Sequence, residues 1–467
     1  MKKINIIIFG TILFSTLCYS QEWDTLGSGF PYSPRCLYVD TSENILYAGG
    51  YFLYAGGVRV DGIARWDGTK WDSLAGGAVV YGSSSGSCMV NAITKYQGNI
   101  YAGGEFFDGV NTEGIALWDG IKWCDVGITG FSNSLSTSNS VVNSIYVYDG
   151  ELYAGGYFDS IDGIRVKNLA KWNGIQWSVP DTLQLCDWLF LNVGCMKEYQ
   201  GDLYFAGNFG GTQDSIKEIG RFDGQNWFSV GGGIKGDTWV HCIEVYQDEL
   251  YVGGYFTALD GNVGNYIMRW DGYNWKDVGG GVMGGGGYNG QVTGMTIYNN
   301  ELWVVGVFEY AGGVPTKYIA KWNGSEWCGI GEYFDNTLAH IAILNNEIIV
   351  AGGGKELLNG LQINYIAKWT GGNYVDTCGV INNLREIKEG EEKSIIYPNP
   401  AQDEITIETS DINNEFFEIS IYSAVGKQVG YTAQQKNQKN FTLSVGELSN
   451  GLYLIKYVSE KETKTAK

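Results

Sequence analysis

The chain has 467 residues, 51 acidic against 31 basic side chains, and a formal net charge of -20. This charge repels a phosphate backbone over most of the surface, so we do not expect nucleic-acid binding. With 69 glycines, 6 prolines and 14% aromatic residues, the composition is that of a strand- and turn-rich globular protein and excludes collagen-like or disordered chains.

The first twenty residues have the pattern of a secretory signal peptide. Lys2 and Lys3 precede an apolar run from Ile6 to Leu17, and small residues lead up to Gln21. The run is too short to span a bilayer, and no later stretch of the sequence approaches transmembrane length. We therefore expect residues 1–20 to be removed and the mature protein to be exported without a transmembrane segment.

Eight cysteines remain in the mature chain, at Cys36, Cys88, Cys124, Cys186, Cys195, Cys242, Cys328 and Cys378. An even number in an exported protein permits disulfides, but the sequence does not choose among the pairings. Several fall within repeated strands, where a buried free thiol is an equal alternative. There is no CxxC pair and there are only two histidines, so we expect no metal and no cofactor.

A short motif recurs along most of the mature chain at intervals of 46 to 54 residues. LYAGGYF and its variants begin at Leu46, Ile100, Leu152, Leu203, Leu250, Leu302 and Ile348. A second motif, such as WDGTKW or WNGIQW, follows each copy. Self-similarity near 50 residues indicates a β-propeller.

Each repeat predicts four strands. The first alternates, as in residues 240–246, and the second is the glycine motif. The third ends at the Trp of the second motif, where Asp-Gly or Asn-Gly predicts a two-residue hairpin turn before the fourth strand. We interpret the Asp of this turn as structural rather than as a calcium ligand, because Asn replaces it in two repeats, at Asn173 and Asn323.

An extra fourth strand precedes the first complete repeat. Residues 23–27, WDTLG, match this strand, so we expect it to complete the last sheet and leave no open edge. The degenerate segment that ends at Tyr374 is the competing candidate.

The repeats resemble those of kelch-type propellers, the superfamily that includes the galactose oxidase propeller domain. The resemblance rests on the glycine doublet, the Tyr before the turn between the first and second strands, and the downstream Trp. It implies an all-β fold in which residues 21–376 form a seven-bladed β-propeller of four-stranded blades. We do not extend the resemblance to the copper site of galactose oxidase, because no motif in the sequence identifies a set of His and Tyr residues that would converge as ligands.

The C-terminal residues resemble another family. Pro398-Asn399-Pro400-Ala401, Gly426-Lys427 and the LSNGLY segment at 448–453 are similar to the type A C-terminal sorting domain of the type IX secretion system of Bacteroidetes-like bacteria. The resemblance implies a small β-sandwich at residues 394–467, after a linker at 377–393. It further implies recognition by the type IX machinery and a secreted, extracellular or outer-membrane surface location. Residues 463–467 lack the apolar last strand that is usual in this family.

The sequence places any binding site on one face. The loops from each fourth strand to the next first strand (4–1 loops) share a face with the loops between second and third strands (2–3 loops). They are long and irregular, and binding residues concentrate on such loops. We predict ligand contacts from the aromatic residues Trp188, Trp239, Tyr288 and Tyr333, which would stack on sugars or anchor a protein. Packing within the loops is the alternative.

No catalytic constellation is identifiable, so we expect a secreted or surface-displayed binding or adhesion module for a glycan or a protein. The two histidines, His241 and His340, fall in first strands, and we favour packed or axis-lining residues over metal ligands. The glycines Gly279, Gly281 and Gly284 form a GxGxxG that we interpret as a loop. The alternative function is an extracellular carbohydrate-active enzyme that uses carboxylates of the 2–3 loops: Asp108, Glu113, Asp159, Asp162 and Asp260.

Overall fold

The computed structural model describes residues 23–74, 89–105, 114–132, 140–180, 192–209, 216–236, 238–285, 289–330, 334–358 and 360–369, and the segments 395–397, 404–408, 417–423, 428–434, 440–445, 453–459 and 463–466. They belong to two units divided near residue 378. The predicted signal peptide, the linker and Tyr374 lie outside the described residues, as do three of the predicted binding residues, Trp188, Tyr288 and Tyr333.

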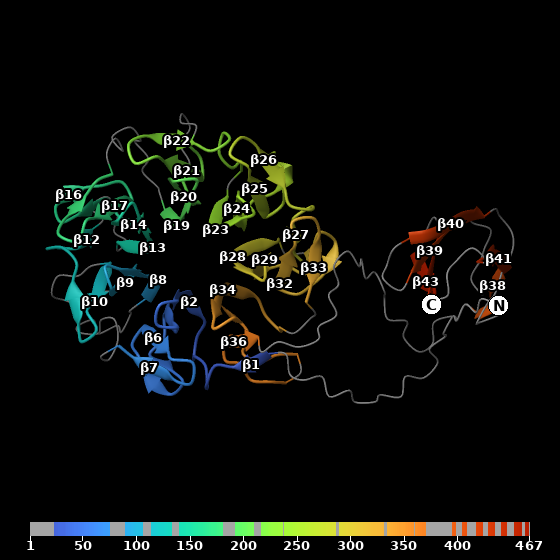
Figure 1. Cartoon of the computed structure of the whole chain (residues 1–467), viewed down its shortest axis with the longest axis horizontal. Helices are drawn as coiled ribbons and strands as arrows, with labels where there is room; N and C mark the ends of the chain where they lie inside the picture. Colours follow the sequence, from blue (N-terminus) through green and yellow to red (C-terminus); the bar gives the residue numbers. More distant parts are fainter. Residues whose placement is uncertain are drawn as a thin grey trace. The chain divides into compact units, whose positions relative to one another are not determined.

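The described strands of residues 23–369 include seven four-stranded antiparallel sheets arranged around a common axis (Figure 1). The innermost, first strands are β2 (Pro34–Asp40), β8 (Met89–Tyr96), β13 (Val141–Tyr148), β19 (Asn192–Tyr199), β23 (Trp239–Tyr246), β28 (Gln291–Tyr298) and β34 (Leu338–Leu344). The second strands are β3 (Ile45–Gly50), β9 (Asn99–Glu105), β14 (Glu151–Tyr157), β20 (Asp202–Asn208), β24 (Glu249–Tyr255), β29 (Glu301–Val307) and β35 (Glu347–Gly352).

The outer half of each sheet carries most of the described tryptophans. The third strands are β6 (Ile63–Trp66), β10 (Ile115–Trp118), β17 (Leu169–Trp172), β21 (Ile219–Phe222), β25 (Ile267–Trp270), β32 (Ile319–Trp322) and β36 (Ile366–Trp369). The fourth strands are β7 (Trp71–Ser73), β11 (Trp123–Asp125), β18 (Trp177–Ser178), β22 (Trp227–Ser229), β26 (Trp275–Asp277), β33 (Trp327–Gly329) and, in the last sheet, β1 (Trp23–Thr25).

The series of sheets closes on itself. Each first strand contacts the first strand of the next sheet, and β34 contacts β2. Strand β1 pairs with β36, with Trp23 opposite Trp369, so the prediction that residues 23–27 complete the last sheet is confirmed. The buried Trp23 ring lies 5.0 Å from the Trp369 ring and 4.9 Å from the Phe334 ring, which fixes this join by aromatic packing.

Short additional elements lie in the connections on the long-loop side. They are β4 (Tyr54–Ala55) with β5 (Val58–Arg59); β12 (Phe131–Ser132) with β15 (Ser160–Ile161) and β16 (Ile164–Arg165); β27 (Val282–Met283) with β30 (Tyr310–Ala311) and β31 (Val314–Pro315); and a 3-10 turn, η2 (Ala258–Asp260). Among the described 2–3 connections, those of the first, third and sixth sheets are therefore small hairpins, and that of the fifth sheet is a helical turn.

Four of the second strands, β3, β9, β14 and β24, contain a glycine doublet, and in β14 it allows two close contacts. A Cβ on Gly155 would lie 2.6 Å from Val193 Cγ1 of the next sheet, and one on Gly156 would lie 2.0 Å from the Val141 carbonyl oxygen of its own sheet. Both distances are too short for any side chain. The motif therefore marks close packing rather than a phosphate-binding loop.

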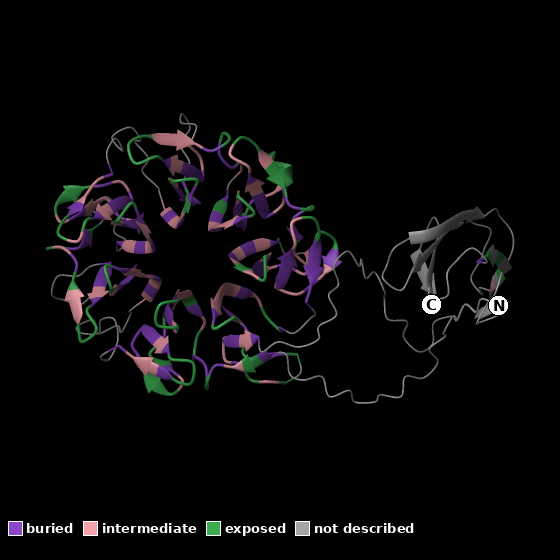
Figure 2. Cartoon of the chain, in the orientation of Figure 1, coloured by how far each residue is buried: buried purple, intermediate pink, exposed green. Residues whose placement is uncertain are grey.

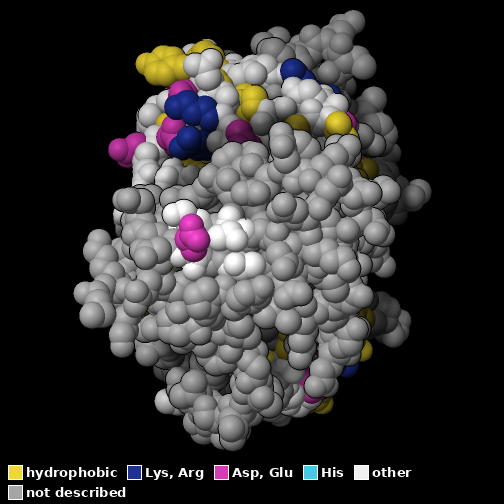
Figure 3. All heavy atoms as spheres, turned by 90° about the vertical axis from the view of Figure 1, so that its right-hand side faces the viewer, with side chains coloured by type: hydrophobic (Ala, Val, Ile, Leu, Met, Phe, Trp, Pro, Cys, Tyr) yellow, Lys and Arg dark blue, Asp and Glu magenta, His cyan; other side chains and the backbone are white. Residues whose placement is uncertain are grey.

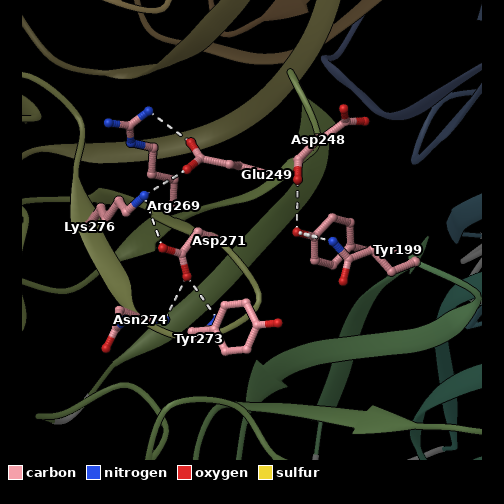
Figure 4. Close-up of polar contacts among 9 residues, drawn as sticks. Tyr199, Asp248, Glu249, Arg269, Asp271, Tyr273, Asn274 and Lys276 are labelled. Atoms are coloured by element: carbon pink, nitrogen blue, oxygen red, sulfur yellow. Dashed lines mark hydrogen bonds and ion pairs between the residues drawn. The ribbon is translucent and has the colours of Figure 1, made fainter.

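Hydrogen bonds join several pairs of neighbouring sheets, some near the outside of the sheets and some near the axis. At the outside, the indole Nε1 of Trp71 donates to Leu26 O (2.8 Å) and that of Trp327 donates to Val278 O (2.7 Å). At the inside, the Tyr199 hydroxyl donates to Asp248 O of the next sheet at 2.8 Å (Figure 4). Buried polar groups of these aromatic residues are thus satisfied across the joints between sheets.

The turn between third and fourth strands differs from the prediction. Trp66 pairs with Trp71, so four residues form the turn and the predicted two-residue hairpin is wrong. Asp67 Oδ1 accepts the amide hydrogens of Thr69 (2.8 Å) and Lys70 (2.9 Å), and Gly68 has a φ of +97°. The carboxylate replaces missing backbone partners, which confirms its structural role.

Ion pairs also recur between second and third strands. Glu151 pairs with Lys171 at 2.7 Å and Glu249 with Arg269 at 2.8 Å. On the side drawn in Figure 3, basic and acidic side chains of the described residues likewise adjoin one another. Figure 2 shows that buried residues occupy the strands, whereas the turns are mostly exposed.

The described strands of the C-terminal unit form two antiparallel sheets. One contains β37 (Ile395–Tyr397), β38 (Glu404–Glu408) and β41 (Asn440–Ser444); the other contains β40 (Gln428–Gln434), β39 (Phe417–Ser423), β42 (Tyr453–Ser459) and β43 (Thr463–Ala466). The polar residues 463–466 form an edge strand on β42, although the sequence lacks the usual apolar last strand. Edge pairing uses backbone groups, so polar side chains are compatible with it.

We predict that Gly156→Ala lowers the free energy of unfolding by about 3 kcal/mol, because the new methyl group would overlap the Val141 carbonyl. Urea unfolding followed by tryptophan fluorescence measures the change. Gly194→Ala is the matched control, since its nearest neighbour would lie 3.6 Å away. Equal stability of the two variants would contradict this packing role.

Candidate functional site

Every first strand contains a β-bulge in the part nearest its 4–1 loop. The strand pairings skip one residue at this point in all seven sheets: Arg35, Asn91, Asn143, Gly194, His241, Thr293 and Ala339. A bulge leaves its extra residue out of the ladder and re-aims the side chain. The bulges therefore place a variable set of side chains on the innermost strands.

The bulge corrects the prediction of simple alternation. In β23 the buried residues are Val240, Ile243 and Tyr246, which are three positions apart. The same spacing, Val-x-x-Ile/Met-x-x-Tyr, occurs at residues 90–96, 142–148, 193–199 and 292–298. This three-residue spacing is the sequence pattern from which the bulge could have been predicted. The same pattern could have identified the site residues other than Trp239 and the histidines.

Side-chain amides connect three adjacent sheets at the bulge level. Asn91 Nδ2 donates to Asn143 Oδ1 at 3.0 Å, and Asn143 Nδ2 donates to Asn192 Oδ1 at 2.7 Å. Asn91 Oδ1 is buried and has no hydrogen-bond partner among the described residues. This chain of hydrogen-bonded amides therefore ends in a free acceptor, to which a hydroxyl or amide of a ligand could donate.

A second group of residues lies where β23 and β28 begin. Gln291 Nε2 hydrogen-bonds to His241 Nε2, and the Trp239 ring stacks on the imidazole at 5.5 Å with an interplanar angle of 19°. Tyr255 pairs with Trp239 across β23 and β24. Trp239 is 41% exposed and Tyr255 38% exposed, so an accessible aromatic pair flanks the polar residues.

The two histidines are neutral at physiological pH. Burial lowers the pKa of His241 to about 4. Burial also lowers the pKa of His340 to about 4, with smaller contributions from the positive charges of Arg35 and His241. The charges of Arg35 and His241 therefore act on His340, although the three residues come from three sheets. We define the axial ring as Arg35, Asn91, Asn143, Asn192, His241, Gln291 and His340.

Free thiols occupy the next position along three of these strands. Cys36, Cys195 and Cys242 are free, and burial raises the pKa of Cys36 and Cys195 to about 12. Cys328, in contrast, is disulfide-bonded. The thiols of the first strands are packing groups, because a protonated, buried thiol is a poor nucleophile.

The axial ring consists of neutral hydrogen-bonding side chains and one cation. No cluster of three or more His, Cys, Asp or Glu that could hold a metal occurs within the described ranges. Neutral imidazoles and amides can donate to and accept from a polar, uncharged ligand, and Arg35 adds one exposed cation.

The described carboxylates of the 2–3 loops bind groups of their own loop or of the adjoining 4–1 loop. Asp162 Oδ1 accepts the amide hydrogens of Ile128 and Thr129 at 2.8 Å each. Asp260 accepts the Thr257 hydroxyl at 2.6 Å, and Asp159 accepts the Ser160 hydroxyl at 3.2 Å. Asp108 and Glu113 lie outside the described residues.

The structure thus places one predicted binding residue, Trp239, beside the axial ring on the long-loop side. It does not bear on Trp188, Tyr288 or Tyr333. Gly279 and Gly281 lie between β26 and β27, where no helix N-terminus follows them, as predicted for a loop.

The fold defines an all-β protein with propeller-like sheets. Residues 395–467 match the family described as a secretion system C-terminal sorting domain. The chain therefore carries the sorting signal of the type IX secretion system, and the protein is secreted or displayed at the cell surface. Within the described residues, no helix has the length and apolar character needed to cross a membrane.

The other comparisons give weaker likenesses. The structure of the GH74 enzyme of Niastella koreensis is 12% identical, covers 95% of this chain and 74% of its own, and has a TM-score of 0.45. The structure of YjhT is 15% identical, covers 59% of this chain and 92% of its own, and has a TM-score of 0.35. No curated protein matches the chain. At these TM-scores neither likeness bears on function.

We predict that acidification destabilises the fold through the two histidines. Their folded-state pKa lies near 4, below the ordinary 6.5, so the unfolded chain binds protons first as the pH falls. Stability is then complete above about pH 6.5 and declines toward pH 4, by up to about 1.4 kcal/mol per pH unit for each histidine. Urea unfolding at several pH values measures this decline.

The matched variant is His241→Gln with His340→Gln. The carboxylates titrate in both proteins, so the difference between the two pH profiles isolates the histidines. A difference that does not change between pH 7 and pH 4.5 would contradict buried, neutral imidazoles.

Proposed function

We propose that residues 21–376 form a seven-bladed, kelch-like β-propeller that acts as an extracellular binding or adhesion module. Residues 377–393 link it to the sorting domain at 394–467, which the type IX secretion machinery recognises. The ligand is a glycan or a surface protein, and it contacts the axial ring and Trp239 from the long-loop face.

The proposal rests mainly on two features of the axial region: a hydrogen-bond acceptor without a partner among the described residues and an exposed aromatic side chain. Asn91 Oδ1 is buried without a partner, while Trp239 is 41% exposed and stacked on His241. Most buried polar groups in proteins have a hydrogen-bond partner, so this acceptor is available to a ligand hydroxyl or amide. An accessible Trp supplies the contact area that binding sites use as an anchor.

A role as a carbohydrate-active enzyme has less support. General acid and base catalysis needs carboxyl groups that are free to reach a substrate. The loop amides and hydroxyls hydrogen-bond the Asp162 and Asp260 carboxylates, which makes these groups part of the loop structure.

We predict that Trp239→Ala weakens ligand binding by the mature chain, residues 21–467, at least tenfold. The loss of the aromatic surface and of its support for His241 is the physical reason. A glycan and surface-protein array identifies the ligand, and titration of that ligand measures the effect. Trp188→Ala combined with Trp239→Ala should abolish binding.

Ile121→Ala is the control variant. Ile121 is 80% exposed in the turn between β10 and β11, on the opposite face, so its loss should leave binding unchanged. Unchanged binding by a folded Trp239→Ala protein would overturn the assignment of this face.

We predict that a chain ending at residue 393 is made but stays inside the outer membrane. Without the sorting domain, the type IX machinery has no signal to engage. Immunoblotting of medium, surface-protease-treated cells and periplasm measures the distribution. The full chain reaches the medium or surface, and equal delivery of the shortened chain would refute the role of residues 394–467.

A further inference from the structure

The fifth sheet lacks a contact that the first and sixth sheets make. In those two sheets, the turn of the 2–3 hairpin covers the indole of the fourth-strand Trp. A Cβ on Gly56 would lie 2.8 Å from Trp71 Cδ1, and one on Gly312 would lie 2.5 Å from Trp327 Cδ1. Trp71 is consequently 3% exposed and Trp327 2% exposed.

The same turns donate a hydrogen bond to the preceding 4–1 loop. Gly56 N donates to Gly29 O, and Gly312 N donates to Gly281 O, both at 2.8 Å. The equivalent acceptor in the fifth sheet is the carbonyl of Gly233, the third glycine of Gly231-Gly232-Gly233. No donor to this oxygen is found among the described residues.

The 2–3 connection of the fifth sheet is held in a different place. Its turn forms η2, with Thr257 capped by Asp260. Asn262 exchanges two hydrogen bonds with the backbone of Lys235: Lys235 N donates to Asn262 Oδ1, and Asn262 Nδ2 donates to Lys235 O, both at 2.9 Å. These bonds draw the turn toward Lys235 and away from Trp275, which is only half-buried.

A groove of about 260 Å³ remains where the hairpin turn would lie. Its lining includes Gly233, Lys235, Asn262, Trp270, Tyr273 and Trp275. In the first and sixth sheets, the hairpin turn at this position donates a hydrogen bond to the glycine carbonyl and packs against the indole. A ligand in the groove of the fifth sheet would need to make the same two contacts.

Tyr273 extends the aromatic surface of the groove. It occupies the turn position that holds Thr69, Ile121, Ile175, Gln225 and Ser325 in the other described turns of this type. It is 85% exposed, but its turn is fixed. Asp271 Oδ1 accepts the amide hydrogens of Tyr273 (2.8 Å) and Asn274 (2.7 Å), and Lys276 bridges Asp271 and Glu249 (Figure 4).

We propose that this groove binds a sugar ring of an uncharged glycan. The apolar face of the ring stacks on Trp275 and Tyr273, and a ring hydroxyl donates to Gly233 O as the glycine amide does in the sister sheets. Asn262, Asn274 and Lys235 offer polar contacts to the remaining hydroxyl groups. A peptide turn would fill the space above the indole but would leave the added ring of Tyr273 unused, which favours the sugar.

The site is separate from the axial ring and does not depend on a ligand there. The decisive variant is Tyr273→Ala in the mature chain, tested on an array of neutral glycans and by titration of the glycan selected. We expect at least a tenfold loss of affinity. Ile175→Ala is the control, because it removes an equally exposed side chain (84%) from the corresponding turn of the third sheet. Trp177 of that sheet is only 2% exposed, so this variant should bind the glycan normally. Trp239→Ala should also retain this glycan.

A second variant closes the groove without removing an aromatic residue. Replacing residues 258–264, ALDGNVG, by the equally long YAGGVRV of residues 54–60 should place a glycine turn over Trp275 and cause the same loss. Thermal unfolding checks that each variant folds. The proposal is overturned if the wild-type chain binds no neutral glycan, if Tyr273→Ala and the graft both bind like the wild type, or if only a cyclic YAGGVRV peptide binds.

Discussion

The contact between a second-strand glycine and a first-strand carbonyl is the constraint on which the rest of this structure depends. At Gly156 a Cβ would lie 2.0 Å from Val141 O, and at Gly104 it would lie 1.9 Å from Met89 O. Only a residue without a side chain allows the first strand to bulge at this point. The bulge in turn frees one residue per sheet from the ladder, so a backbone requirement determines where variable side chains appear.

Structural and variable positions are separated within each repeat. The Trp and Tyr residues that hydrogen-bond across the joints recur from sheet to sheet, as Trp71 and Trp327 or Tyr148 and Tyr199 illustrate. The bulge positions hold Arg, Asn, Gly, His, Thr and Ala instead. Because the joints fix the scaffold, these positions can change without loss of the fold, which is the usual condition for a binding surface.

The connections between strands likewise differ from repeat to repeat on a constant framework. In the first and sixth sheets a hairpin turn closes the space over the fourth-strand Trp, whereas in the fifth the bonds of Asn262 to Lys235 hold the turn elsewhere. A local change in hydrogen bonding thus converts a packed core position into an open groove. Variation between repeats therefore produces two distinct surfaces on one framework, the axial ring and the groove beside Trp275.

Much of the fold was predictable because its main interactions are local or periodic. The glycine doublets and the paired Trp residues predict the strands and their order, and the match of residues 23–27 to a fourth strand predicts the join with β36. The length of the turn after Trp66 was mispredicted, because Asp67 bonds to two amides and so stabilises a longer turn than Asp-Gly normally makes.

The candidate site was less predictable. Trp239 could be predicted from its place at the edge of a long loop, and the histidines from their position in first strands. The asparagines could not, since their neighbourhood depends on the bulges and on contacts between sheets about 50 residues apart. The three-residue spacing of Val240, Ile243 and Tyr246 is the local trace of the bulge, but pairing with the second strand is needed to recognise it.

The central claim is that the bulged ends of the first strands form the ligand-contacting surface of an exported binding module. Hydrogen–deuterium exchange of the mature chain, with and without the ligand selected by the array, tests it most directly. Slower exchange in the ligand complex at residues 239–243 and 291–295, with the turns at 97–98 and 149–150 unchanged, is the predicted result. Protection confined to those turns, on the opposite face, would contradict it.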